Sequence, residues 1–107
     1  MEIGVKDNSV NLYGLHPMMQ IANMKAAVIW HGYGLDLVIT SGNDSKHMPG
    51  SLHYHGRACD YRIWGMSDEI VHDVVNLLKQ KLGPDYDVVL EKDHIHCEYD
   101  PSNPKVI

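Results

Sequence analysis

Apolar positions recur at helical spacing early in the chain. The stretch 17–31 begins with Pro17, which suits a first helical turn, and glycines follow it at 32 and 34. The apolar positions at helical spacing are Ile21, Met24 and Val28. We predict a scaffold helix here, whose methionines serve as core filler.

A second helical pattern begins after Gly65. Ser67 is a suitable N-cap, and Asp68 and Glu69 suit the positive first turn. The apolar stripe comprises Ile70, Val74, Leu77, Leu78 and Leu82. Because Gly83 and Pro84 follow, this helix is predicted to end near Leu82.

Branched apolar residues and turn signals predict strands elsewhere. Residues 35–40 and 57–63 are expected to be two of them, and 87–91 and 94–99 to form a hairpin around Lys92-Asp93. Together the elements predict an α+β fold with a small, mostly antiparallel sheet and two main helices.

Length and composition fit one globular domain. The chain has 107 residues, of which 44% are hydrophobic and 21% charged, so we expect one domain over 1–107, monomeric, with 101–107 as a terminal tail. A net charge of −5 with scattered basic residues argues against nucleic acid as a partner. No apolar run is long enough for a membrane span, and no secretory signal is evident, so the chain is expected to be cytoplasmic as synthesised.

Cys59 and Cys97 each adjoin a polar residue of interest, Asp60 and His96. On strands, neighbouring side chains point to opposite faces, so the cysteines are predicted to be buried thiols facing away from Asp60 and His96.

Five of the eight histidines fall in two short segments, which is what a transition-metal site requires. They are His47, His53, His55, His94 and His96. His94 and His96 are two apart on a predicted strand and so project from one face. His53 and Asp60 are seven apart, which puts them on opposite faces unless a turn or bulge at Gly56 reverses the parity.

Residues 51–60, Ser-Leu-His-Tyr-His-Gly-Arg-Ala-Cys-Asp, match the pattern Ser-x-His-x-x-Gly-x-Ala-x-Asp at every fixed position. With Asp93-His94-Ile95-His96, they resemble the zinc peptidase family of D-alanyl-D-alanine carboxypeptidases, D-alanyl-D-alanine dipeptidases and phage L-alanyl-D-glutamate endolysins. The same residues resemble the Hedgehog amino-terminal signalling domain, which shares that fold. The resemblance covers about residues 35–99.

This resemblance implies one Zn²⁺ ion on His53, Asp60 and His96, with an open position for a zinc-bound water as nucleophile. His47 matches a histidine that flanks the metal in the Hedgehog-like branch, and His55 is a reserve ligand. Glu98, two residues after His96, is a candidate to orient that ligand.

The remaining catalytic candidates lie at the hairpin and are Glu91, Asp93 and His94. The resemblance places the general base at Asp93, whereas a two-residue turn would pair Glu91 across from His94, on the ligand face; both stay open. The family's upstream arginine is not found in 41–46, and the substitutes for it are Lys46, Arg57 and Arg62.

The expected function is therefore a zinc metallopeptidase acting on peptidoglycan stem peptides, as a D-alanyl-D-alanine carboxypeptidase or an L-alanyl-D-glutamate endopeptidase. Phage lysis would bring such a protein to the cell wall. The alternative is a non-catalytic zinc-binding interaction or virion-associated domain of the same fold. A calcium-dependent domain ranks last, because 43–50 contains few acids.

Overall fold

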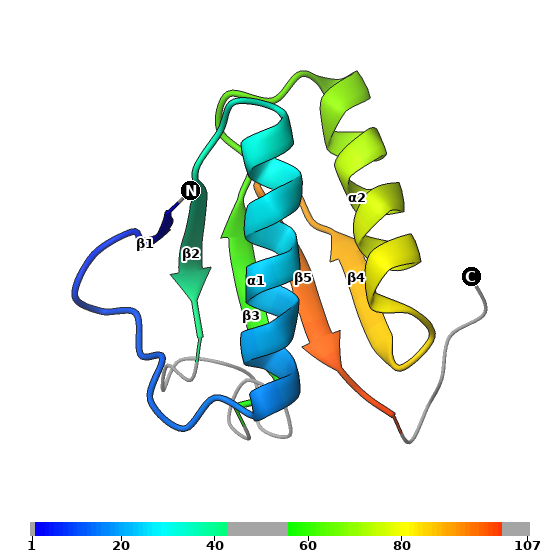
Figure 1. Cartoon of the computed structure of the whole chain (residues 1–107). Coiled ribbons are helices and arrows are strands. Elements are labelled where there is room, and N and C mark those ends of the chain that lie inside the picture. The colour runs from blue at the N-terminus through cyan, green and yellow to red at the C-terminus, as the bar shows by residue number, and fades with distance from the viewer. Residues whose placement is uncertain (1, 43–55, 102–107) are drawn as a thin grey trace.

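The computed structural model describes residues 2–42 and 56–101. Within these residues, two helices are interspersed among five strands along the chain (Figure 1). In chain order they are β1 (Ile3–Val5), α1 (Pro17–Gly32), β2 (Leu37–Ser41), β3 (Ala58–Arg62), α2 (Asp68–Leu82), β4 (Tyr86–Leu90) and β5 (His94–Tyr99). The predicted α+β class is confirmed.

The strands of the described part form one five-stranded sheet in the order β1-β2-β3-β5-β4. Three of the four pairings are antiparallel, and β1 pairs with β2 in parallel. The sheet is thus mixed, although mostly antiparallel as predicted. β1 was not predicted, because three residues are too short to show a strand periodicity.

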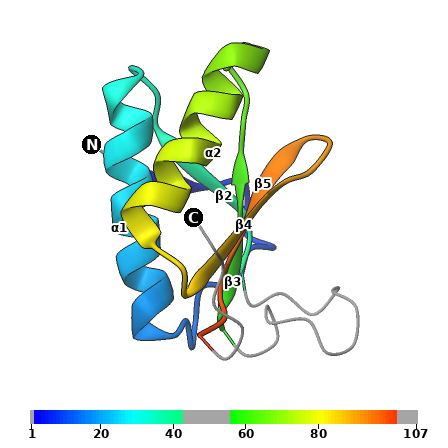
Figure 2. The same cartoon turned by 90° about the vertical axis from the view of Figure 1, so that its right-hand side faces the viewer.

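Both helices lie on the same side of the sheet, and the opposite side carries no helix of the described chain (Figures 1 and 2). Side chains of β3 and β5 alternate between these two faces. On the helix side, Cys59, Tyr61, Ile95 and Cys97 are fully buried in the core. Their neighbours Asp60 and His96 therefore belong to the helix-free face.

The N-cap of helix α1 is His16, whose Nδ1 accepts a hydrogen bond from the Met18 N–H at 3.1 Å. The buried face of the helix carries both large and small side chains, since Met19, Ala22, Ala26 and Trp30 are each at most 1% exposed. The positions predicted as the apolar stripe face outward instead, with exposed fractions of 42% for Ile21, 64% for Met24 and 59% for Val28. The prediction of core-filling methionines is confirmed for Met19 and was wrong for Met24, because α1 is apolar on more than one side and buries a different stripe from the one predicted.

Helix α2 matches its prediction closely. The Ser67 hydroxyl accepts a hydrogen bond from the Ile70 N–H at 3.2 Å, and the helix ends before Gly83, which has φ of +85°. Its buried stripe comprises Val71, Val74, Val75, Leu78 and Leu82, whereas Ile70 and Leu77 of the predicted stripe are only partly buried.

The hairpin of β4 and β5 has the predicted register. Leu90 pairs with Ile95, and the Glu91 N–H donates to the His94 carbonyl at 2.9 Å. Lys92 and Asp93 are the two residues between these partners, so the predicted two-residue connection is confirmed.

Neither helix of the described residues is long and apolar enough to cross a membrane.

Candidate functional site

The pairing of β3 with β5 brings two of the three expected zinc ligands together. Asp60 and His96 are direct partners in the register of these strands, 36 residues apart in sequence. The Oδ1 atom of Asp60 lies 2.9 Å from Nδ1 of His96. Both side chains are largely shielded from solvent, with exposed fractions of 13% and 19%.

The second nitrogen of His96 is held by Glu98. Nε2 of His96 lies 2.8 Å from Oε1 of Glu98, on the same strand two residues away. If Nε2 carries the proton and donates it to Glu98, the lone pair of Nδ1 points toward Asp60. This is the arrangement by which a carboxylate orients a metal-binding histidine.

Burial lowers the pKa of His96, but hydrogen bonds to Asp60 and Glu98 outweigh it and raise the pKa above the ordinary value of 6.5. In the metal-free protein this imidazole therefore holds a proton more readily than a free one. Because zinc needs an unprotonated nitrogen, metal binding at this place would release that proton.

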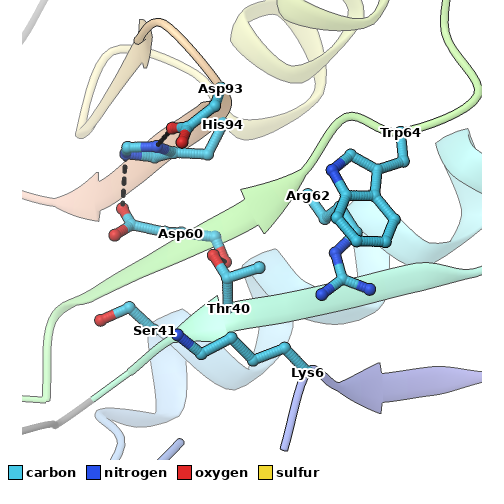
Figure 3. A pocket seen from close by; sticks show the side chains of 8 residues that line it. All are labelled: Lys6, Thr40, Ser41, Asp60, Arg62, Trp64, Asp93 and His94. Carbon is cyan, nitrogen blue, oxygen red and sulfur yellow. Dashed lines mark hydrogen bonds and ion pairs between the residues drawn. The ribbon is translucent and has the colours of Figure 1, made fainter.

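His94 and Asp93 form a second hydrogen-bonded pair beside the first. Oδ1 of Asp93 lies 2.6 Å from Nδ1 of His94, and Nε2 of His94 lies 3.7 Å from Oδ1 of Asp60 (Figure 3). The Asp93 side chain is 82% exposed, and its hydrogen bond with His94 lowers the pKa of its carboxyl. Asp93 is therefore a carboxylate at neutral pH.

Asp60, Asp93 and His94 line one open pocket of about 380 Å³ on the helix-free face (Figure 3). Glu91 does not line it, although its backbone pairs with His94 as predicted. Of the two candidate bases, Asp93 is thus the one that borders the pocket.

Five residues of β2 and β3, or of the segments that follow β1 and β3, line the rest of this pocket. They are Lys6, Thr40, Ser41, Arg62 and Trp64. Arg62 was a candidate from the sequence, whereas Arg57 does not line the pocket. Lys6 was missed because β1 was missed. Trp64 was missed although its spacing of two from Arg62 was visible in the sequence.

Several expected site residues lie outside the described residues: the ligand His53, the flanking His47, the reserve ligand His55 and the candidate cation Lys46. Among residues 2–42 and 56–101, no three His, Cys, Asp or Glu side chains are grouped to hold a metal ion. The described part therefore supplies two of the three predicted ligands, and His53 as the third stays a prediction.

Gly56 adopts the turn conformation expected of it. Its φ is +69°, and a Cβ atom there would lie 2.2 Å from the carbonyl oxygen of Gly14. The carbonyl of Gly56 also accepts a hydrogen bond from the His16 N–H at 2.8 Å. The chain therefore turns immediately before β3, and whether the turn brings His53 to Asp60 stays a prediction.

Cys59 and Cys97 are fully buried thiols that form no disulfide and lie opposite each other on β3 and β5, on the helix side. Burial strongly raises the pKa of Cys97. Both predictions for the cysteines are confirmed, and the thiols face away from Asp60 and His96.

No protein-family model matches this chain, and no curated protein matches it either. The likeness to zinc peptidases consequently depends on the two motifs at 51–60 and 93–96.

Proposed function

We propose that this protein is a zinc-dependent peptidase that hydrolyses peptidoglycan stem peptides, on a fold of the Hedgehog/DD-peptidase type. The observation that supports it best is the arrangement of Asp60, His96 and Glu98. A carboxylate oxygen and an imidazole nitrogen face each other at 2.9 Å, and a second carboxylate holds the other nitrogen of the ring at 2.8 Å.

These donors suit zinc. Imidazole nitrogen and carboxylate oxygen are common ligands of catalytic zinc, which uses three protein ligands and keeps one position open. In the proposal, Asp60, His96 and His53 hold the ion, and Glu98 orients His96. Zinc supplies a Lewis acid that polarises the peptide carbonyl and makes hydroxide available near neutral pH.

Asp93 serves as the general base in this proposal. It is ionised at neutral pH, exposed to the pocket and hydrogen-bonded to His94. Its carboxylate takes a proton from the water that attacks the scissile carbonyl carbon. As the carbon–nitrogen bond breaks, Asp93 delivers that proton to the leaving amine. His94 fixes the carboxylate in position.

Metal analysis combined with digestion tests the proposal. The protein is stripped with a chelator and reloaded, its zinc content is measured, and purified peptidoglycan and defined stem peptides are incubated with it. Mass spectrometry of the products identifies the scissile bond. We expect about one zinc per chain and release of D-alanine or cleavage after L-alanine.

Matched variants separate binding from catalysis. Asp60→Asn and His96→Ala should lose zinc, whereas Asp73→Asn and His72→Ala, on the exposed face of α2, should keep both zinc and activity. Asp93→Asn should retain zinc and lose about 10²-fold or more in rate. Stoichiometric zinc without cleavage of any peptide would identify the alternative, a non-catalytic zinc-binding domain.

A further inference from the structure

We infer that Lys6 and Arg62 form an anion subsite in the pocket beside Asp60, and that it binds a carboxylate of the peptide ligand. The role in substrate choice rests on the proposed function, but the binding itself does not. The subsite combines residues from two ends of the chain that meet only in the folded sheet.

The strand pairings place both cations beside the candidate metal ligands. Lys6 follows β1, and its N–H donates to the Ile39 carbonyl at 3.0 Å, which continues the pairing with β2. Arg62 ends β3, two residues after Asp60 and directly across from His94. Lys6 and Arg62 line the same pocket as Asp60 and His94 (Figure 3).

The charges of the pocket are divided between its two sides. Asp60 and Asp93 are each engaged by a histidine. Within the described residues, neither Lys6 nor Arg62 has a carboxylate within ion-pair distance. The neighbouring Asp7 accepts a hydrogen bond from the Ser9 N–H at 2.8 Å, and its pKa is lowered chiefly by Ser9 and to a smaller extent by the charges of Lys6 and Arg62. Two cations thus border a pocket without an ion-pair partner among the described residues, in a chain with a net charge of −5.

Trp64 positions the arginine. The guanidinium carbon of Arg62 lies 3.8 Å from the centre of the Trp64 ring. Stacking uses the flat face of the guanidinium and leaves the N–H groups at its edge free to form two parallel hydrogen bonds with a carboxylate. A carboxylate is therefore a better match for this site than an isolated point anion.

The ligand is a short peptide with a carboxylate close to the bond that faces Asp60. Such a carboxylate has two sources: the C-terminus of the peptide, and the free carboxylate of a glutamyl residue within the peptide. The first would make the enzyme a carboxypeptidase, and the second an endopeptidase.

Calorimetric titration of zinc-free protein tests the subsite, because a bound metal would itself attract carboxylates. The probes are an acyl-D-Ala-D-Ala peptide, its C-terminal amide, an amidated L-Ala-D-Glu peptide and its D-Gln counterpart. One acidic probe should bind about tenfold more tightly than its neutral partner. The pair that shows this difference identifies the source of the carboxylate.

Lys6→Met and Arg62→Met should each weaken the acidic probe about threefold, leave the neutral one unchanged, and together abolish the preference. Arg62→Lys and Trp64→Leu should give intermediate losses. Lys79→Met, on the exposed face of α2, removes the same charge at a distance and should change nothing.

Equal binding of acidic and neutral probes, a preference that survives in the double variant, or no binding of any probe would overturn the subsite. A preference without cleavage by zinc-loaded protein would leave the subsite standing and refute the peptidase. Cleavage by zinc-loaded protein without a preference for the acidic probe would refute the subsite and leave the peptidase standing.

Discussion

Asp60 and His96 are opposite partners on neighbouring antiparallel strands, with Oδ1 of one 2.9 Å from Nδ1 of the other. This contact joins two residues 36 positions apart and is fixed by backbone pairing on both sides. The strand register thus places the two side chains, and Glu98 sets the orientation of the imidazole ring.

The variant Glu98→Gln tests the orienting role. Loss of the carboxylate that holds Nε2 of His96 should weaken zinc binding about 10- to 100-fold, as measured by competition with a chromophoric chelator. Asp87→Asn is the matched control, because Asp87 lies directly across from Glu98 on β4. Unchanged zinc affinity in Glu98→Gln would refute the role.

The stability of metal-free protein should fall as the pH rises from 6 to 8. Although burial lowers the pKa of His96, Asp60 and Glu98 raise it above its unfolded value of about 6.5. The stabilisation by the imidazolium is therefore fully present below that value and is lost as the pH rises through the higher, folded-state pKa. Urea unfolding of chelated protein across this range measures the effect. His96→Asn should flatten the trend and His72→Asn should not; a flat wild-type profile would contradict the prediction.

A buried hydrogen bond anchors α1 to β3. The Tyr61 hydroxyl donates to Oδ1 of Asn23 at 2.6 Å, and both side chains are buried. Tyr61→Phe leaves the amide oxygen without this donor and should lower the free energy of unfolding by about 1–3 kcal/mol in urea titrations. Tyr33→Phe, at a solvent-exposed helix end, is the control. Equal stability of the two variants would show that water replaces the bond.

Alanine substitutions at two glycines distinguish the stability cost of backbone strain from that of steric contact. Gly34 has φ of +74° with open space around it, so Gly34→Ala should cost only the strain, about 1 kcal/mol. Gly56 has a similar φ but lies against Gly14. Gly56→Ala should therefore cost about 1–3 kcal/mol more, measured by thermal or urea unfolding. Equal losses would mean that the segment at Gly14 moves aside freely.

The two thiols should be protected in the native protein. Cys59 and Cys97 are fully buried, and burial raises the pKa of Cys97, so little reactive thiolate is available. Ellman's reagent at pH 8 should label neither thiol rapidly in the folded protein and both in denaturant. A fast native reaction of one equivalent would show that β3 or β5 opens locally.

The elements that were predictable from sequence carry their own local signals. Ser67 and Gly83 mark both ends of α2, and the spacing between Glu91 and His94 sets the hairpin register. The positions of Cys59 and Cys97 follow from strand alternation alone. For the site, the motifs indicated Asp60 and His96, and the spacing of two on a strand indicated Glu98; the fold brings all three together.

The errors have a common cause in long-range packing. α1 is apolar on more than one side, so periodicity alone does not reveal that Ala22 and Ala26 are buried and Met24 is exposed. Lys6 lines the pocket only because β1 pairs with β2. This contact joins distant segments and cannot be detected from the sequence of a three-residue strand.

On β3 and β5 the residues of the core and of the proposed site alternate one by one: Tyr61 and Cys97 are fully buried beside Asp60 and His96. A slip of one position between these strands would turn the ionisable side chains into the apolar interior and expose the hydrophobic ones. Misregistered or partly folded chains consequently lack the ligand pair altogether. Metal uptake at this place would then report on the integrity of the whole sheet, and a zinc-sensitive dye would serve as an assay of correct folding.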